Sequence, residues 1–289
     1  MTHIIVFGAS GFIGRVVFSD FSHDGNCSVT GYSSRNCNLL SESDVSRALD
    51  MAKGDTRVIF TAAITRTVDN SYSAMISNIA MAHNVCREIG KGNVNHVTFL
   101  STIDVYGIHV KRGSKITESF VPNPNDYYAT SKLVSELLLR QASDRSGVPL
   151  AVFRLPGIYG IDGPGSTVGQ MIQRAKATKK IIVYGEGNNL RDFVYVNDVS
   201  KIIRKAVAKK LNNLLNIGTG KSVALGRVAS IIRDALPFEV ELIYDRRSPR
   251  ADNRIKDIEL DCTKLQTIFP DISMTELSLG VKRYVSGTL

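Results

Sequence analysis

The sequence has 289 residues, of which 43% are hydrophobic and 22% are charged, and its formal net charge is +9. This composition is typical of a globular protein with a sizeable core, and it excludes a disordered chain, a collagen-like repeat and a coiled coil. No apolar run approaches the roughly 18 residues of a membrane helix, and the first residues lack the features of a signal peptide. The four cysteines show no paired spacing, so we expect reduced thiols in a cytoplasmic protein.

The positive charge is concentrated in the second half of the chain. Residues 1–150 carry 14 Lys and Arg against 13 Asp and Glu, whereas residues 151–289 carry 22 against 14. Such an excess suits an anionic partner or, for the lysines at 201, 205, 209 and 210, a solvated helix face. No aromatic residues alternate with the basic ones, so we expect neither nucleic acid nor a membrane as a partner.

Short apolar runs alternate with longer amphipathic ones. Those at 4–7, 28–32, 58–62, 97–100, 150–154 and 214–217 are typical of buried parallel strands. The stretches 43–51, 72–89 and 128–143 between them predict helices. The alternation indicates an α/β fold with a doubly wound parallel sheet. After about residue 160 the pattern becomes irregular, with a Gly-rich loop at 160–169 and a polar stretch at 246–254, which predicts a smaller domain over the carboxyl edge of the sheet.

A glycine-rich segment follows the first predicted strand and opens an amphipathic stretch. Glycines at this place permit a tight turn and let the backbone approach a pyrophosphate, which the N-terminus of the next helix then faces. The alternative is a purely structural turn. The segment predicts a dinucleotide site formed by Gly8, Ser10, Gly11, Phe12, Ile13 and Gly14.

The end of the second predicted strand indicates which dinucleotide binds. An NAD site usually places Asp or Glu here for the ribose 2′-hydroxyl, but this chain has Ser33, Ser34 and Arg35, with no acid before Glu42. Two hydroxyls and a guanidinium suit a 2′-phosphate, so we predict NADP, with NAD as the alternative. The less favoured alternative is that Arg35 is a solvent-facing loop residue.

Tyr128 and Lys132 lie four residues apart at the start of a predicted helix, which places both side chains on one face. A free phenol has a pKa of about 10. An ammonium about 4 Å away would lower that pKa by up to about three units at an effective dielectric of about 20. We therefore expect Tyr128 to move a proton on a carbonyl or alcohol oxygen during hydride transfer. The spacing alone is common in helices without any catalytic role.

Together with further motifs, these segments resemble the extended short-chain dehydrogenases/reductases that act as nucleotide-sugar epimerases, dehydratases and reductases. The resemblance extends over more than 200 residues in the family's order. It includes residues 8–14, 61–63, 101–107, 128 with 132, 154–160, 185–187, 191–199 and 216–220. It implies a Rossmann domain for NAD(P) at 1–160, with 190–217 returning to it. It also implies that 161–289 mainly bind a nucleoside-diphosphate sugar.

The resemblance assigns further residues to the site. Thr102 would complete a catalytic triad with Tyr128 and Lys132 and polarise the reacting sugar oxygen. Arg191 would clamp the diphosphate, and Arg250 is a second candidate, with Arg247 competing because the family's spacing is not kept. On the dinucleotide side the resemblance implies Asn38, Leu39, Ala62, Ala63, Asn78, Tyr128, Lys132 and Pro156.

Three departures from the family's motifs bear on which reaction and which sugar this chain is expected to use. Ile103 stands where a 4,6-dehydratase has an aspartic acid, so dehydration is disfavoured. Asp104 and the region near Thr167 lack the Cys and His of 3,5-epimerising GDP-fucose synthases. Gly157 replaces an Asn often seen near the substrate, which leaves the sugar open. Asp104 could act as an acid or accept backbone hydrogen bonds, and the second interpretation is favoured. No cluster has metal-ligand spacing, so no metal is expected.

We therefore predict an enzyme that uses NADPH to reduce a nucleotide-linked 4-ketosugar for deoxysugar or surface-polysaccharide synthesis. The alternative is a C4-epimerase with a retained NAD and the same triad. A catalytically silent NADP-sensing module is less favoured, since Tyr128 and Lys132 are both present. The helices predicted at 72–89 and 128–143 pair two subunits in the family, so the resemblance also implies a homodimer.

Overall fold

The computed structural model describes residues 1–51, 54–92, 94–107, 113–163, 165–246 and 257–288, which form two compact units. The first unit comprises Met1–Val105, Pro124–Arg154 and Val199–Leu215. The second comprises Tyr106–Asn123, Leu155–Asp198 and Asn216–Leu289.

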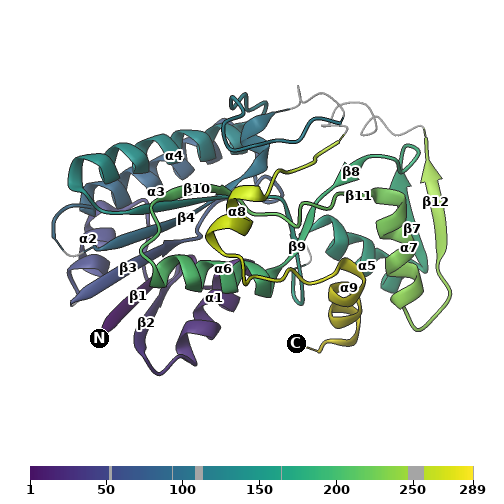
Figure 1. The fold of residues 1–289 in the computed structure, drawn as a ribbon, viewed down its shortest axis with the longest axis horizontal. Helices are drawn as coiled ribbons and strands as arrows, with labels where there is room; N and C mark the ends of the chain where they lie inside the picture. Colours follow the sequence, from purple (N-terminus) through teal and green to yellow (C-terminus); the bar gives the residue numbers. More distant parts are fainter. Residues whose placement is uncertain (52–53, 93, 108–112, 164, 247–256, 289) are drawn as a thin grey trace. The chain divides into compact units, whose positions relative to one another are not determined.

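The first unit is built on a six-stranded sheet (Figure 1) with the order β10-β5-β4-β3-β1-β2. Its strands are β1 (Thr2–Phe7), β2 (Cys27–Tyr32), β3 (Asp55–Phe60), β4 (His96–Thr102), β5 (Leu150–Leu155) and β10 (Asn213–Asn216). β1 pairs in parallel with both β2 and β3, so that Phe7 lies opposite Tyr32 on one side and Phe60 on the other. The carboxyl ends of these three strands therefore meet at one edge. β1 is the point where the strand order reverses, which is where open α/β sheets bind ligands.

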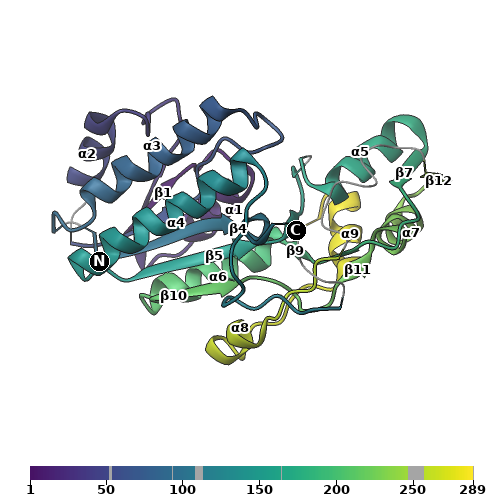
Figure 2. The ribbon, with the colours of Figure 1, turned by 90° about the horizontal axis from the view of Figure 1, so that it is seen from above.

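Helices cover both faces of this sheet. Figures 1 and 2 show α2 (Glu42–Asp50), α3 (Tyr72–Glu88) and α4 (Tyr127–Ser146) on one face. On the other face lie α1 (Phe12–Ser22) and α6 (Val196–Ala208). Because both faces are covered, the central strands are buried, and residues 4–7 of β1 are almost entirely buried and apolar. The α/β fold with a doubly wound parallel sheet is confirmed.

The six predicted strands and three predicted helices are all present, with ends that differ by a few residues. β3 begins earlier than predicted and ends at Phe60, so Ala62 lies in the following loop. β4 extends through Thr102 and continues into a short 3-10 helix at Ile103–Tyr106.

The second unit contains more regular structure than the sequence pattern predicted. It has the two-stranded pairs β6 (Gly157–Tyr159) with β9 (Phe193–Tyr195), β7 (Lys180–Tyr184) with β12 (Glu241–Asp245), and β8 (Leu190–Arg191) with β11 (Val223–Ala224). Its helices are α5 (Thr167–Thr178), α7 (Leu225–Ala235), α8 (Thr263–Ile268) and α9 (Leu277–Ser286). The prediction of a loop through residue 169 is wrong at its end, because Ser166 caps α5 and Val168 and Ile172 are buried in the core of this unit.

Candidate active site

The turn between β1 and α1 leaves no room for side chains at two of its glycines. Gly8 has a φ of +89°, and a Cβ there would lie 2.6 Å from Thr61 Oγ1 and 2.7 Å from the Ala62 nitrogen. A Cβ on Gly14 would lie 2.0 Å from the Gly8 carbonyl oxygen. The chain therefore turns tightly at the carboxyl end of β1 and starts α1 against the loop that follows β3.

The N-terminus of α1 differs from those of α2, α3 and α4. Side chains of Ser41, Ser71 and Asp126 accept hydrogen bonds from first-turn amides of those three helices. At α1 the N-cap is Gly11, and no described side chain caps the helix. Unpaired amides at a helix N-terminus attract an anion. The turn therefore fits the pyrophosphate of a dinucleotide, with Ser10 exposed and Phe12 and Ile13 half-buried beside it.

The turn after β2 exposes the predicted phosphate ligands Ser34 and Arg35. Its shape depends on Asn36, whose Oδ1 accepts from the Ser33 amide at 2.7 Å and from the Ser33 hydroxyl at 3.2 Å. The Asn36 side-chain amide in turn donates to the Gly31 carbonyl at 3.3 Å. Asn36, which the sequence analysis did not single out, holds this turn at the sheet edge next to β1.

The two residues expected near adenine differ in their surroundings. Asn38 is exposed, and its Oδ1 accepts a hydrogen bond from the Leu40 amide at 3.1 Å. The Leu39 side chain is buried in the core of the first unit, and its carbonyl accepts from Asn84 Nδ2 at 2.9 Å. Of the pair, Asn38 therefore presents its side chain to the surface.

The loop after β3 carries Ala62 and Ala63, both half-buried, and Asn78 of α3 fixes this loop. The Asn78 side chain accepts from the Ile64 amide at 2.8 Å and donates to the Ile64 carbonyl at 2.9 Å. It also donates to Ser131 Oγ on α4 at 3.2 Å. Both amide hydrogens of Asn78 are thus used inside the protein, so its contribution is to tie the loop to α4.

Tyr128 and Lys132 both lie in the first turns of α4, four residues apart. The backbone of Tyr128 is held from two sides, since its amide donates to Asn70 Oδ1 at 3.0 Å and its carbonyl accepts from the Ser131 hydroxyl at 2.7 Å. The Lys132 side chain is buried against β4, with its Nζ 4.1 Å from the centroid of the Phe99 ring.

The predicted effect of Lys132 on Tyr128 is wrong in this structure. Burial raises the pKa of Tyr128 well above its usual range, and the carboxylates of Asp104 and Asp126 raise it further. Among the described residues, the cation that lowers this pKa is Arg66. Burial also lowers the pKa of Lys132 to about 7, against the opposing influence of Glu136. Lys132 does not lower the pKa of Tyr128 because its ammonium points toward the Phe99 ring and Glu136.

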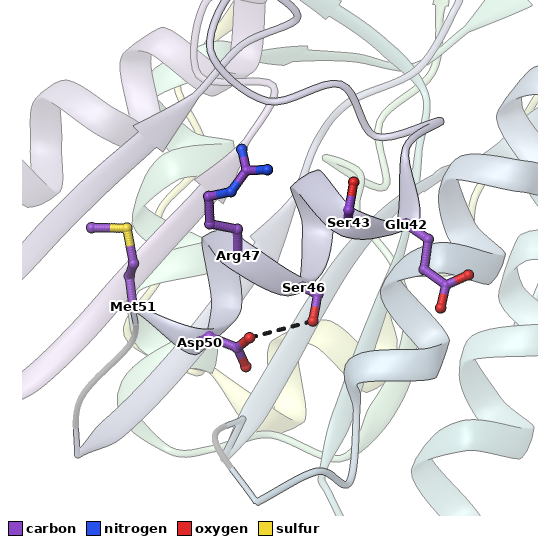
Figure 3. A pocket seen from close by; sticks show the side chains of 6 residues that line it. All are labelled: Glu42, Ser43, Ser46, Arg47, Asp50 and Met51. Atoms are coloured by element: carbon purple, nitrogen blue, oxygen red, sulfur yellow. Dashed lines mark hydrogen bonds between the residues drawn. The ribbon is translucent and has the colours of Figure 1, made fainter.

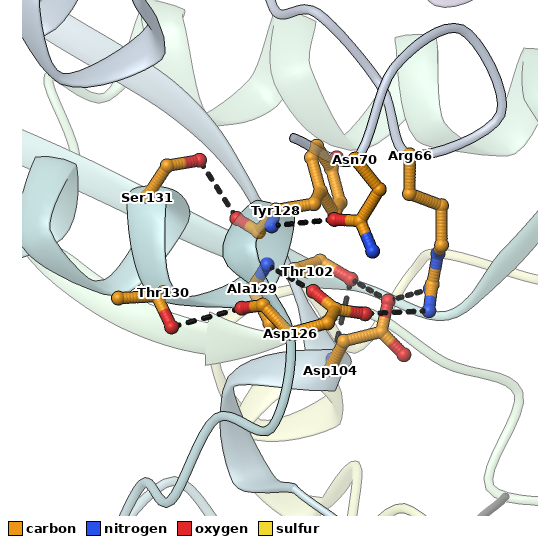
Figure 4. Close-up of polar contacts among 9 residues, drawn as sticks. All are labelled: Arg66, Asn70, Thr102, Asp104, Asp126, Tyr128, Ala129, Thr130 and Ser131. Carbon is orange, nitrogen blue, oxygen red and sulfur yellow. Dashed lines mark hydrogen bonds and ion pairs between the residues drawn. The ribbon is translucent and has the colours of Figure 1, made fainter. Parts of the chain in front are cut away.

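Arg66 is the centre of a charged cluster around Tyr128 (Figure 4). Its guanidinium carbon lies 5.8 Å from the centroid of the Tyr128 ring. The guanidinium forms ion pairs with the carboxylate of Asp104 and, at 3.4 Å, with that of Asp126. Thr102 donates its hydroxyl to Asp104 Oδ2 at 2.8 Å, and the Asp104 amide donates to Thr102 Oγ1 at 3.2 Å. The favoured interpretation of Asp104 is therefore wrong, since its carboxylate binds the side chains of Thr102 and Arg66.

A buried ion pair lies one turn further along α4. Glu136 receives hydrogen bonds from Arg154 of β5, with Nη2 2.7 Å from Oε2 and Nε 3.1 Å from Oε1. The Ser101 hydroxyl donates to the same carboxylate. Both charged side chains are less than a tenth exposed. A fork-shaped pair of this kind fixes α4 against β4 and β5 and places a negative charge near Lys132.

Of the site residues predicted in the second unit, the structure describes Arg191 and Pro156. Arg191 lies in β8, and its guanidinium donates to the Leu190 carbonyl at 2.7 Å. Pro156 precedes β6 and is half-buried. Arg250 and Arg247, the candidates for a second clamp, lie outside the described residues.

Other features of the described chain do not form a competing site. The hollow in Figure 3 runs along α2 and shares no residue with the glycine turn or the Tyr128 cluster; it is lined by Glu42, Ser43, Ser46, Arg47, Asp50 and Met51. Within the described residues, no three His, Cys, Asp or Glu side chains are grouped as metal ligands would be. None of the described helices is both long and apolar enough to cross a membrane.

Besides Asn36, the sequence analysis also missed Arg66 and Glu136. Arg66 follows the Ala62-Ala63 segment, and its position just after a strand at the switch point of the sheet was an available signal. Glu136 lies four residues after Lys132, the same helical spacing that singled out Tyr128.

Comparison with known proteins identifies the relatives of this chain. The model of the family described as "NAD dependent epimerase/dehydratase family" matches residues 4–218. A provisionally named UDP-glucose 4-epimerase of Methanocaldococcus jannaschii is 29% identical over 230 residues, which cover 77% of this chain and 72% of that protein. The GDP-6-deoxy-D-talose 4-dehydrogenase of Aggregatibacter actinomycetemcomitans is 25% identical over 256 residues, covering 86% and 85%.

A solved structure shares the fold. The UDP-glucose 4-epimerase of Thermotoga maritima, crystallised with UDP-glucose, superposes with a TM-score of 0.85 at 23% identity, covering 98% of this chain and 97% of that one.

Proposed function

The chain belongs to the NAD dependent epimerase/dehydratase family, and we propose that it is an NADP(H)-dependent reductase of a 4-ketosugar linked to a nucleoside diphosphate. The observation that carries the proposal is the cluster at the end of β4 and the start of α4, in which Arg66 lies over the Tyr128 ring and pairs with Asp104, the carboxylate to which Thr102 donates. One hydroxyl can give a proton to the sugar oxygen and the other can hydrogen-bond it.

The glycine turn would hold the pyrophosphate, and Ala62 and Ala63 would lie beside the nicotinamide ribose. Ser33, Ser34 and Arg35 would bind the 2′-phosphate of NADP. The absence of a carboxylate from this turn supports NADP over NAD, because a carboxylate there would bind the ribose 2′-hydroxyl of NAD. When bound, the dinucleotide supplies the hydride. The first unit would therefore be the dinucleotide domain. The second would bind the nucleotide sugar, with Arg191 and Arg250 as candidates for the diphosphate.

The electrostatics of Tyr128 are compatible with reduction. Because burial and two carboxylates raise its pKa, the phenol holds its proton at neutral pH. A protonated phenol can donate to a carbonyl oxygen as hydride reaches the carbon. The dehydrogenase name of the relative from Aggregatibacter is consistent with simple hydride transfer at C4.

A C4-epimerase is the second candidate, and the names of the relatives from Methanocaldococcus and Thermotoga favour it. The same hydroxyls would oxidise the sugar, and the hydride would return to the other face. An epimerase of this kind keeps its dinucleotide through each turnover, whereas a reductase must exchange it.

Two measurements test these assignments. Incubation of the purified protein with NADPH or NADH and a panel of UDP-, GDP-, CDP- and dTDP-linked 4-ketosugars should consume NADPH with at least one sugar. Denaturation of the purified protein should release no tightly bound NAD. Release of stoichiometric NAD, together with interconversion of C4 epimers, would replace the reductase by the epimerase.

A further inference from the structure

The hydroxyl of Thr102 forms two hydrogen bonds with Asp104. It donates to Asp104 Oδ2 at 2.8 Å, and its oxygen accepts from the Asp104 amide at 3.2 Å. A threonine hydroxyl has one hydrogen and two lone pairs. Its hydrogen and one lone pair are therefore in use, which leaves one lone pair.

The direction of the first bond follows from the charge of Asp104. An ionised carboxylate can only accept hydrogen bonds, and the Arg66 guanidinium is paired with this carboxylate. The hydrogen between the two side chains therefore belongs to Thr102. With its hydrogen turned to Asp104, Thr102 can accept a hydrogen bond from a ligand but cannot donate one.

Arg66 holds Asp104 in this place. Its guanidinium bridges Asp104 and Asp126, and Asp126 is itself fixed as the N-cap of α4 by accepting from the Ala129 amide at 2.7 Å. The bridge joins three separate segments of the chain: the loop after β3, the 3-10 helix after β4, and the start of α4 (Figure 4). Rotation of Asp104 away from Thr102 would break the ion pair.

We propose that Asp104, held by Arg66, is a positioning residue that turns Thr102 into a hydrogen-bond acceptor for a substrate hydroxyl. The site consequently binds the hydroxy form of the sugar more tightly than the keto form. This inference rests on the proposed function, and it changes the role expected of Thr102, which would not polarise the ketone. Tyr128 alone donates to the ketone oxygen.

The consequence for the reaction is a bias in its direction. If the bound alcohol is stabilised relative to the bound ketone, the equilibrium on the enzyme shifts toward reduction. The same preference makes the alcohol product a tighter ligand than the ketone substrate. The arrangement therefore favours conversion of bound ketone to bound alcohol and leaves the equilibrium in solution unchanged.

The test compares the affinities of the two forms without turnover. Pairs of UDP-, GDP-, CDP- and dTDP-linked 6-deoxyhexoses that differ only in a hydroxyl or a ketone at C4 are titrated calorimetrically with the oxidised dinucleotide present. A Tyr128→Phe background prevents reaction and keeps the ring that Arg66 covers. We expect the hydroxy form to bind about 5-fold tighter or more, which corresponds to the roughly 1 kcal/mol of one hydrogen bond. Asp104→Ala should reduce this ratio about 5-fold.

Two further variants separate positioning from general damage. In a Thr102→Val background, Asp104→Ala should leave the ratio unchanged, whereas in a Thr102→Ser background, which keeps the hydroxyl, its effect should return. Asp144→Ala removes an exposed carboxylate from the same helix α4 and should leave the ratio as it was.

The outcomes distinguish this inference from the proposed function. If the protein binds and reduces a ketosugar but Asp104→Ala weakens both forms alike, the positioning role is refuted and the proposed function stands. If neither form of any pair binds, the proposed function fails and this inference fails with it.

Discussion

Replacement of Gly14 by alanine is the most direct perturbation of the proposed dinucleotide turn. The added Cβ would lie 2.0 Å from the Gly8 carbonyl oxygen and 2.8 Å from Thr61 Oγ1, whereas ordinary contacts of a Cβ begin near 3.4 Å. The turn and the start of α1 must therefore move apart by more than 1 Å. Hydrogen bonds to a phosphate do not survive a displacement of that size.

The magnitude follows from two terms. Overpacking of a tight contact costs about 1–3 kcal/mol of folding free energy. Loss of two charge-assisted hydrogen bonds to the pyrophosphate, at about 1.5 kcal/mol each, weakens dinucleotide binding by about 100-fold. Gly14→Ala should therefore lower the urea midpoint and raise the Kd for NADPH by about two orders of magnitude.

The matched control is Gly25→Ala. A Cβ on Gly25 meets nothing within 4 Å, and the residue does not have a positive φ. Its stability should change by less than about 0.5 kcal/mol, and its Kd for NADPH, measured by fluorescence titration, should equal that of the wild type. Equal NADPH affinity for Gly14→Ala and Gly25→Ala would refute the assignment of this turn to the dinucleotide.

Three further variants test other parts of the account. Glu136→Gln leaves the buried guanidinium of Arg154 without its carboxylate partner and should lower the free energy of unfolding in urea by about 3–5 kcal/mol; an unchanged urea midpoint would contradict this. The same substitution should move the pKa of Lys132 below about 7, which the pH profile of kcat/KM would report. Burial lowers the pKa of His96 from 6.5 to about 4. The neutral His96 therefore contributes about 3 kcal/mol to the free energy of unfolding, which is fully present above pH 6.5 and is lost as the pH falls through about 4. His96→Gln should remove this loss, and an unaltered pH dependence of unfolding would argue against it. Arg35→Ala should raise the KM for NADPH about 10-fold and leave that for NADH unchanged; equal effects on both would remove Arg35 from the 2′-phosphate site.

The fold of the first unit could be predicted because its strands are buried on both faces. Residues 4–7 and 150–154 are continuous apolar or nearly apolar runs, and such runs at regular spacing identify parallel strands from local sequence. The second unit was harder, because glycines near residue 165 suggested a loop. The helical apolar spacing of Val168, Ile172 and Ala175 nevertheless places α5 in the core of this unit.

The candidate site was predicted only where its residues share one helix. Spacing placed Tyr128 and Lys132 on α4, but spacing does not fix where an ammonium points, and Phe99 comes from β4, about 30 residues earlier. Arg66, Asp104 and Asp126 come from three separate segments that only the folded chain brings together. No periodicity in the sequence links them.

The central claim is that Tyr128 gives the proton to a sugar oxygen while a nicotinamide gives the hydride. The measurement that tests it most directly is the rate of NADPH consumption with an accepted nucleotide-linked 4-ketosugar, compared between the wild type and Tyr128→Phe. The account predicts that kcat falls by about 10²–10⁴-fold, with little change in the affinity for NADPH. Equal rates for the two proteins would contradict it.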